Sequence, residues 1–99
     1  MDPDLPDLTI ADVVISTAGR DAGSLFYVLE ADETWLTLVN GKDRTIEKPK
    51  RKKRKHAKKV LRSETRVAEK LRAGDKVLSS ELRRDLAYLS RELQSKTGG

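Results

Sequence analysis

The sequence predicts a mainly β fold that ends in two short helices. Short runs of β-branched and aromatic residues, separated by turn residues, fill the first half of the chain. No apolar period of helical length appears before residue 60, and a leucine period of three and four residues follows it. The chain has 99 residues, which suffices for one small domain with tails.

Four strands are expected in the first half of the chain, and they differ in how many of their faces should be buried. β-branched residues such as Val13 and Val14 predict the first strand, and the second is apolar on both faces, so we expect cover on each side. Asn40 and Gly41 are typical of a two-residue type I′ hairpin, so a return strand should follow, with Ile46 as its apolar member. The strands are expected over residues 9–16, 25–30, 34–39 and 42–47. Such short strands with close turns favour a small, strongly bent sheet or a barrel.

Helical features begin after residue 61. Ser63 is a suitable N-cap for a helix over residues 64–73, and Gly74 is a suitable stop. A second helix should begin at Ser79 or Ser80. Its apolar stripe consists of leucines three or four residues apart, namely Leu78, Leu82, Leu86, Leu89 and Leu93. The two helices either pack on the sheet as a hairpin or form an appendage that binds another protein.

Charge is segregated along the chain. Residues 1–41 carry eight acidic side chains and one basic one, whereas residues 42–62 carry two acidic and twelve basic ones. The net charge of +5 therefore conceals an acidic front and a strongly basic middle. We divide the chain into a flexible acidic leader (1–7), the strands (8–47), a basic arm with a possible closing strand (48–62) and a helical extension (63–99).

The basic arm is the most informative feature for function. Nine of the twelve residues from 48 to 59 are Lys or Arg, and such a run repels itself, so we expect it to be extended or mobile without a partner. Each cation can neutralise a phosphate and release a counterion, and Arg51 and Arg54 can grip phosphate oxygens in bidentate fashion. The density exceeds that of an ordinary solvated linker, and the run lacks the apolar stripe of a membrane-surface helix. A nucleic acid is therefore the favoured partner.

Other chemistry has little support in the sequence. There is no Cys and only one His, His56, so a metal site is not expected; His56 is either a phosphate or base contact or solvated filler. Neither paired carboxylates nor a nucleophile motif or a phosphate-binding glycine loop is present, so we expect neither an enzyme nor a cofactor. No apolar run could span a bilayer, and the acidic start differs from a signal peptide, which together favour a cytoplasmic protein with no membrane partner.

The few aromatic residues are open to two interpretations. Phe26 is expected in the core, whereas Trp35 is either core or an exposed ring on which unpaired bases stack. Tyr88 is offset from the leucine stripe, so we expect it to be partly exposed.

Residues 13–29 resemble the KOW motif, a strand–loop–strand unit with glycines in its loop. The loop residues are Gly19, Arg20, Asp21 and Gly23, and the likeness continues through Asn40-Gly41, Arg44 and the Lys-Pro-Lys run that begins at Lys48. Over residues 8–62 the chain is similar to small bacterial KOW-domain RNA-binding proteins, and through them to KOW-containing large-subunit ribosomal proteins. The resemblance implies an SH3-like β-barrel and RNA binding in a ribosomal or translation setting.

The prediction for function is therefore non-catalytic binding of RNA, most simply ribosomal RNA or another RNA of the translation machinery. The expected contacts are Arg20, Arg44, Lys48, Lys50, Arg51, Lys52, Lys53, Arg54, Lys55, His56, Lys58 and Lys59, with Gly19, Asp21 and Gly23 shaping the loop. DNA binding through the same arm is a further reading. The chief alternative is a protein-interaction module of the transcription or translation machinery that uses the leucine stripe; burial of that stripe on the sheet would count against it.

Overall fold

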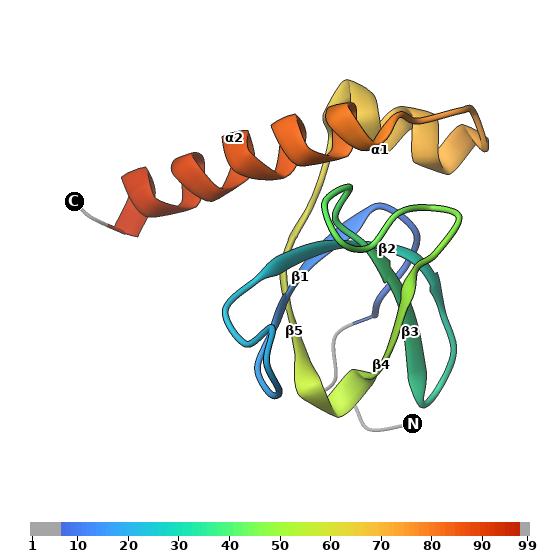
Figure 1. Ribbon diagram of the computed structural model, residues 1–99. Helices are drawn as coiled ribbons and strands as arrows, with labels where there is room; N and C mark the ends of the chain where they lie inside the picture. Colours follow the sequence, from blue (N-terminus) through green and yellow to red (C-terminus); the bar gives the residue numbers. More distant parts are fainter. Residues whose placement is uncertain (1–6, 98–99) are drawn as a thin grey trace.

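Five antiparallel strands and two helices make up the fold (Figure 1). The computed structural model describes residues 7–97, so nearly all of the expected acidic leader lies outside the described residues. The strands are β1 (Asp12–Ser16), β2 (Leu25–Ala31), β3 (Trp35–Val39), β4 (Lys50–Lys53) and β5 (Ala57–Arg62). A 3₁₀ turn, η1 (Arg54–His56), joins the last two, and the helices are α1 (Arg66–Ala73) and α2 (Ser79–Thr97). The prediction of a mainly β fold with two C-terminal helices is thus confirmed, but only α1 is short, since α2 has 19 residues.

The strand order is β4-β3-β2-β1-β5, so the chain forms a meander whose last strand returns to pair with the first. The edge strands β4 and β5 are connected only through η1, and within the described residues no pairing joins them. The sheet is strongly curled but open (Figure 1).

The prediction of a return strand over residues 42–47 is wrong. Those residues form a loop, and β4 begins only at Lys50. The Asn40 side chain accepts hydrogen bonds from the backbone N–H groups of Lys42 and Arg44, at 2.9 and 3.0 Å, and so holds the chain in a local turn. Gly41 alone adopts a positive φ, whereas a type I′ hairpin needs two such residues.

Each face of the sheet covers its own apolar cluster. On one face Val13, Tyr27 and Val39 are aligned across three strands and pack with residues of both helices. On the other face Val14, Phe26 and Leu38 belong to a second cluster, which the curl of the sheet encloses. Apolar cover on both faces of β2, and a core position for Phe26, were expected from the sequence and are confirmed.

Both helices end or begin close to the predicted residues. Gly74 terminates α1 in the left-handed conformation, and α2 begins at Ser79, as expected. The N-cap of α1 is Thr65 rather than Ser63: its side chain accepts a hydrogen bond from the backbone N–H of Ala68. Ser63 is buried instead, where its hydroxyl lies 2.8 Å from that of Tyr27.

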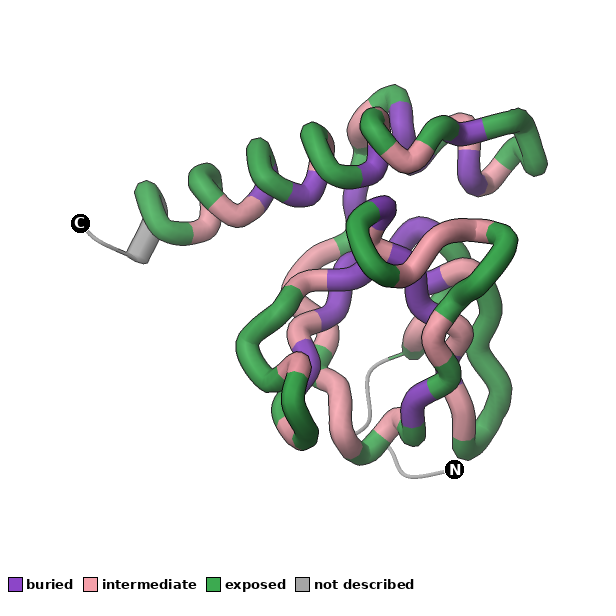
Figure 2. The backbone as a smooth tube through the Cα atoms, viewed as in Figure 1, coloured by how far each residue is buried: buried purple, intermediate pink, exposed green. Residues whose placement is uncertain are grey.

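The leucine stripe of α2 is for the most part core. Leu82, Leu86 and Leu89 are buried in the cluster shared with the sheet, and Leu93 is partly buried. Leu78 alone among the five is half exposed. Figure 2 shows the buried positions of α2 on the side that faces the sheet. The helices therefore pack on the sheet, which is the first of the two arrangements that the sequence allowed.

One glycine determines how closely α2 approaches the sheet. The loop after β3 runs against the first turn of α2, where Arg83 donates a hydrogen bond of 2.7 Å to the carbonyl of Gly41. A Cβ at Gly41 would lie 2.3 Å from the Ser79 carbonyl oxygen and 2.8 Å from Leu82 Cβ. Only glycine fits there, both for its positive φ and for lack of space.

Candidate functional site

The stretch expected as a mobile basic arm is part of the sheet. Its residues form β4, η1 and β5, where β4 pairs with β3 and β5 pairs with β1. The charge repulsion that predicted mobility is relieved in two ways: strand alternation sends neighbouring cations to opposite faces, and acidic residues bind some of them.

Lysines on the inner face of β4 have internal partners. Lys50 and Lys52 are paired with Leu38 and Leu36 of the enclosed cluster, so their stems lie along the inner face. Their ammonium groups reach the Asp21 carboxylate, at 2.6 Å from Lys50 and 3.1 Å from Lys52. Lys52 also donates to the carbonyl of Ala18. These two cations therefore hold the loop between β1 and β2 and are not free for a phosphate.

Asp21 is the acceptor at the centre of this arrangement. Partial burial opposes its ionisation, but hydrogen bonds from Lys50, Ser16 and Lys52 outweigh that cost and hold the pKa of Asp21 well below its ordinary value. The Ser16 hydroxyl donates at 2.7 Å. Gly19 and Gly23 adopt positive φ in the same loop. In this structure the loop residues Gly19, Asp21 and Gly23 shape the loop and attach it to β4, and Arg20 is exposed at its tip.

The outer face presents cations that form no salt bridge with the described residues. Arg51 and Lys53 are exposed and lie over the Trp35 ring, with the guanidinium carbon 4.9 Å and the ammonium nitrogen 5.6 Å from the ring centroid. Lys55 in η1 and Lys58 in β5 are exposed as well. We call Arg20, Arg51, Lys53, Lys55 and Lys58 the cationic surface. The salt bridges found among the described residues include none of these five side chains.

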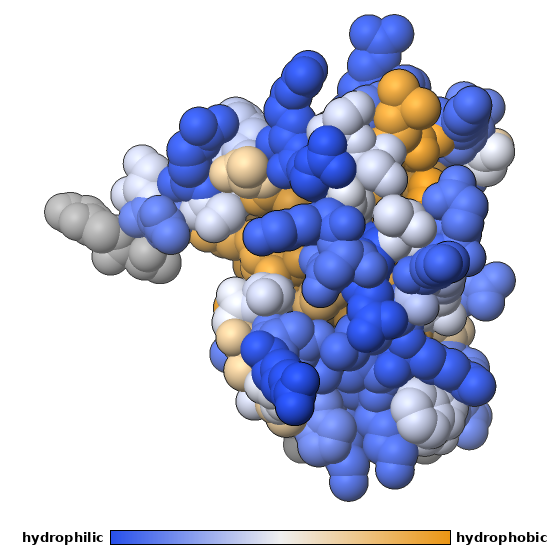
Figure 3. Space-filling model, viewed as in Figure 1, coloured by the Kyte–Doolittle hydropathy of each residue, from blue (hydrophilic) through white to orange (hydrophobic). Residues whose placement is uncertain are grey.

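Two hydrogen bonds to backbone carbonyl groups hold this end of the sheet together. The Arg54 guanidinium donates to the carbonyl of Asp32 at 2.9 Å, which connects η1 to the turn between β2 and β3. The amide N–H of Thr17 donates to the carbonyl of His56, which connects η1 to the start of the loop that carries Arg20. The cationic surface thus lies on an ordered frame. Figure 3 shows hydrophilic side chains covering this end of the molecule, and apolar atoms in the seam between α2 and the sheet.

The structure separates the remaining predicted contacts from this surface. Lys59 lies 3.3 Å from the buried carboxylate of Asp12 and also donates to the carbonyl of Asp7. Arg44 and Lys48 belong to the loop that precedes β4, at the opposite end of that strand from η1 (Figure 1). The predicted contacts therefore do not form one continuous surface.

Trp35 is half buried, in a position between the two alternatives that the sequence left open. Its indole stands on the outer face at the start of β3, next to a polar hollow of about 200 Å³ lined by Glu30, Asp32, Thr37 and Arg51. The Asp32 carboxylate accepts hydrogen bonds from the backbone N–H groups of Trp35 and Thr34, which fix the turn and lower the pKa of Asp32. Sequence reasoning missed Glu30 and Asp32, because both lie in the acidic front of the chain and only the fold brings them next to Arg51.

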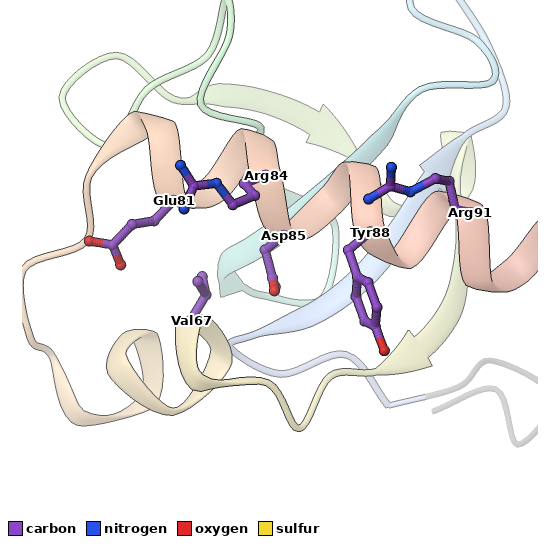
Figure 4. Close-up of a pocket in the computed structure, with 6 residues that line it drawn as sticks. All are labelled: Val67, Glu81, Arg84, Asp85, Tyr88 and Arg91. Carbon is purple, nitrogen blue, oxygen red and sulfur yellow. The ribbon is translucent and has the colours of Figure 1, made fainter.

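A second hollow of about 420 Å³ lies between α1 and α2 (Figure 4). Its carboxylates have internal partners: Glu81 accepts from Lys70 at 3.0 Å, and Asp85 accepts from the hydroxyls of Tyr27 and Thr65. Figure 4 shows Asp85 and Tyr88 pointing to the α1 side of α2. Tyr88 is 48% exposed, which confirms the expectation of partial exposure. This hollow is formed by the packing of the helices, and its acidic groups hold them together.

Comparison with known proteins gives no family. The chain matches no family model, and the search of characterised proteins found no match either. Within residues 7–97, no three His, Cys, Asp or Glu side chains lie together in an arrangement that could hold a metal ion. In the same part of the chain, neither helix has both the length and the apolar character that crossing a membrane requires.

Proposed function

We propose that this protein binds structured RNA through the cationic surface and performs no chemistry on it. The observation that carries the proposal is the set of five exposed cations around η1 that form no salt bridge within residues 7–97, beside a half-exposed tryptophan. Phosphates supply the missing counter-charge, and releasing their condensed counterions drives binding. The ordered frame beneath the cations favours a partner of fixed shape, as in folded RNA.

We further propose that the curled sheet is an SH3-like barrel of the KOW type. A meander in which the fifth strand pairs with the first, with a 3₁₀ turn before it, supports that assignment. The likeness to KOW-domain proteins then makes ribosomal RNA, or another RNA of the translation machinery in the cytoplasm, the partner to test first. Arg20 is the loop residue that would contact it, since Asp21 is engaged with lysines.

The alternative, a protein partner on the leucine stripe, has less support. Leu82, Leu86 and Leu89 are already covered by the sheet, so only Leu78 would offer a large exposed apolar side chain from the stripe. A single exposed leucine is ordinary on a protein surface.

The test is the salt dependence of binding to purified ribosomal RNA. Five cations that each neutralise one phosphate give a slope of log K against log salt of roughly −3.5 to −4.5. The variant K53Q/K55Q/K58Q should lower the magnitude of that slope by roughly 2 to 3. A matched control, K42Q/K48Q/K76Q, removes the same charge from exposed lysines outside η1 and its flanking strands and should leave most of the slope.

Two results would reject the proposal. A slope near zero for the unmodified protein would remove phosphate neutralisation as the driving force. Equal losses in the two triple variants would show that net charge alone, and not the cationic surface, determines binding. Sedimentation of the protein with ribosomal subunits at low salt, and its release at high salt, would identify ribosomal RNA as the partner.

A further inference from the structure

The hollow beside Trp35 combines four kinds of group on one patch of the outer face. Strand register aligns Glu30 of β2 with Thr37 of β3, and Thr37 with Arg51 of β4. Trp35 lies two residues before Thr37, so its ring stands on the same face. A carboxylate, a hydroxyl, a guanidinium and an indole therefore border one space of about 200 Å³. That is too small for drug-sized ligands, whose sites need roughly 300–1,000 Å³, and suits a single flat ring system.

A β-bulge is what brings Glu30 to this face. Regular alternation from the buried Val28 would direct Glu30 inward, toward the enclosed apolar cluster. The register shift between Val28 and Glu30 adds one residue to β2, and Glu30 then pairs with the outward-facing Thr37. Bulges of this kind re-aim a side chain and are common beside functional sites.

The Glu30 carboxylate is not used by the other groups around the hollow. Among the described residues, no hydrogen bond or ion pair involves the Glu30 side chain, although Arg51 borders the same space. The Arg51 guanidinium has the Trp35 ring as its partner. Stacking of a base on an aromatic ring is a stronger contact than an exposed cation on that ring, so a base can replace the guanidinium and leave Arg51 for the adjoining phosphate.

We propose that this hollow binds one unpaired guanine of the RNA, an inference that rests on the proposed function. The base stacks on Trp35, and the Glu30 carboxylate accepts from guanine N1–H and N2–H. A carboxylate offers two acceptors side by side, and guanine is the one standard base whose Watson–Crick edge offers two adjacent donors. Adenine and cytosine place an acceptor beside their amino group, and uracil has a single donor between two acceptors.

The turn before Trp35 fixes the stacking platform before any ligand arrives. Asp32 accepts from the backbone of Thr34 and Trp35, and Arg54 holds the carbonyl of the same aspartate. The Trp35 backbone also pairs with Lys53 of β4. A platform fixed in this way loses little conformational entropy when the base stacks.

The experiment uses the full chain and uridine octamers with one central guanosine, inosine, adenosine, cytidine or uridine. Trp35 is the only tryptophan, so its fluorescence reports stacking at this site alone. We expect quenching and an affinity for the guanosine octamer roughly 5- to 100-fold above the others. Inosine lacks the N2 amino group and should lose most of that preference.

Substitution separates recognition from general charge effects. Glu30→Gln should abolish the preference for guanosine over inosine while quenching persists. Glu33→Gln is the matched control, since Glu33 lies in the neighbouring turn, does not line the hollow and carries the same charge. It should strengthen binding of every octamer alike and keep the guanosine preference.

Two outcomes distinguish this inference from the proposed function. Salt-dependent binding of all five octamers with equal affinity, or without quenching, would overturn the guanine site and leave RNA binding intact. Absence of binding to the octamers and to ribosomal RNA at low salt would overturn both.

Discussion

Tyr27 donates its hydroxyl hydrogen to the carboxylate of Asp85, a residue 58 positions further along the chain. The same hydroxyl contacts the hydroxyl oxygens of Ser63 and Thr65, at 2.8 and 3.3 Å. One phenol in the middle strand of the sheet therefore connects β2 with the N-cap of α1 and with α2. Burial, together with the hydrogen bond to Asp85, raises the pKa of Tyr27 to about 12.

Tyr27→Phe should destabilise the protein by about 1–3 kcal/mol, because Asp85 and Ser63 lose a buried partner. Urea unfolding at neutral pH measures the change. Tyr88→Phe is the control, since that side chain is 48% exposed and its hydroxyl makes no hydrogen bond with the described part of the chain. Its free energy of unfolding should stay within about 0.5 kcal/mol of that of the unmodified protein. Equal effects of the two substitutions would contradict the connecting role of Tyr27.

Gly41→Ala should cost about 2–5 kcal/mol, from left-handed strain and from the collision of the new Cβ with α2. Gly23→Ala offers the comparison: its φ is +91°, but nothing lies within 4 Å of the added Cβ. Strain alone, about 1–2 kcal/mol, should act there. Thermal unfolding of both variants tests the difference, and a larger loss for Gly23→Ala would mean that α2 does not depend on close approach at Gly41.

Asp21→Asn should cost about 1–3 kcal/mol at neutral pH, because Lys50 and Lys52 lose their shared acceptor. The pKa of Asp21 is depressed in the folded state, so its contribution is complete above the unfolded value of about 4 and is lost as the pH falls below it. The urea midpoints of the variant and of the unmodified protein should therefore converge as the pH is lowered from 7 to 3. Curves that stay parallel across that range would argue against the ionised acceptor.

Leu86→Ala should cost about 2–5 kcal/mol, because it opens a cavity between α2 and the sheet. Leu78→Ala, at the 50% exposed end of the same stripe, should change the free energy of unfolding by less than about 1 kcal/mol. Chemical denaturation of the two variants decides whether the stripe is core or a free interface. A small effect at Leu86 would restore the protein-partner alternative.

Local signals in the sequence predicted most of the element types. β-branched and aromatic runs gave three strands to within a few residues, and Gly74 and Ser79 correctly mark where α1 ends and α2 begins. The error after Asn40 arose because its side chain caps backbone groups two and four residues ahead, so the loop replaces a tight hairpin. Ser63 and Thr65 both suit an N-cap, and only tertiary contact with Tyr27 distinguishes them.

The site was harder to predict than the fold, because a dense basic run hides the alternation of its own strands. Lys50 and Lys52 differ from Arg51 and Lys53 only in the face to which they point, and Asp21 on a distant loop selects the inner pair. Glu30 reaches the outer face through a bulge, which no periodicity in β2 announces. Such features depend on register, and register is set by contacts far apart in sequence.

The far end of α2 extends beyond the sheet, away from η1 (Figure 1). A fluorophore or surface linker joined after that helix would therefore lie apart from the cations and from Trp35. A protein immobilised through this end would present η1 to the solution in a single orientation. The helix is thus a natural attachment handle for single-molecule or surface-based binding measurements.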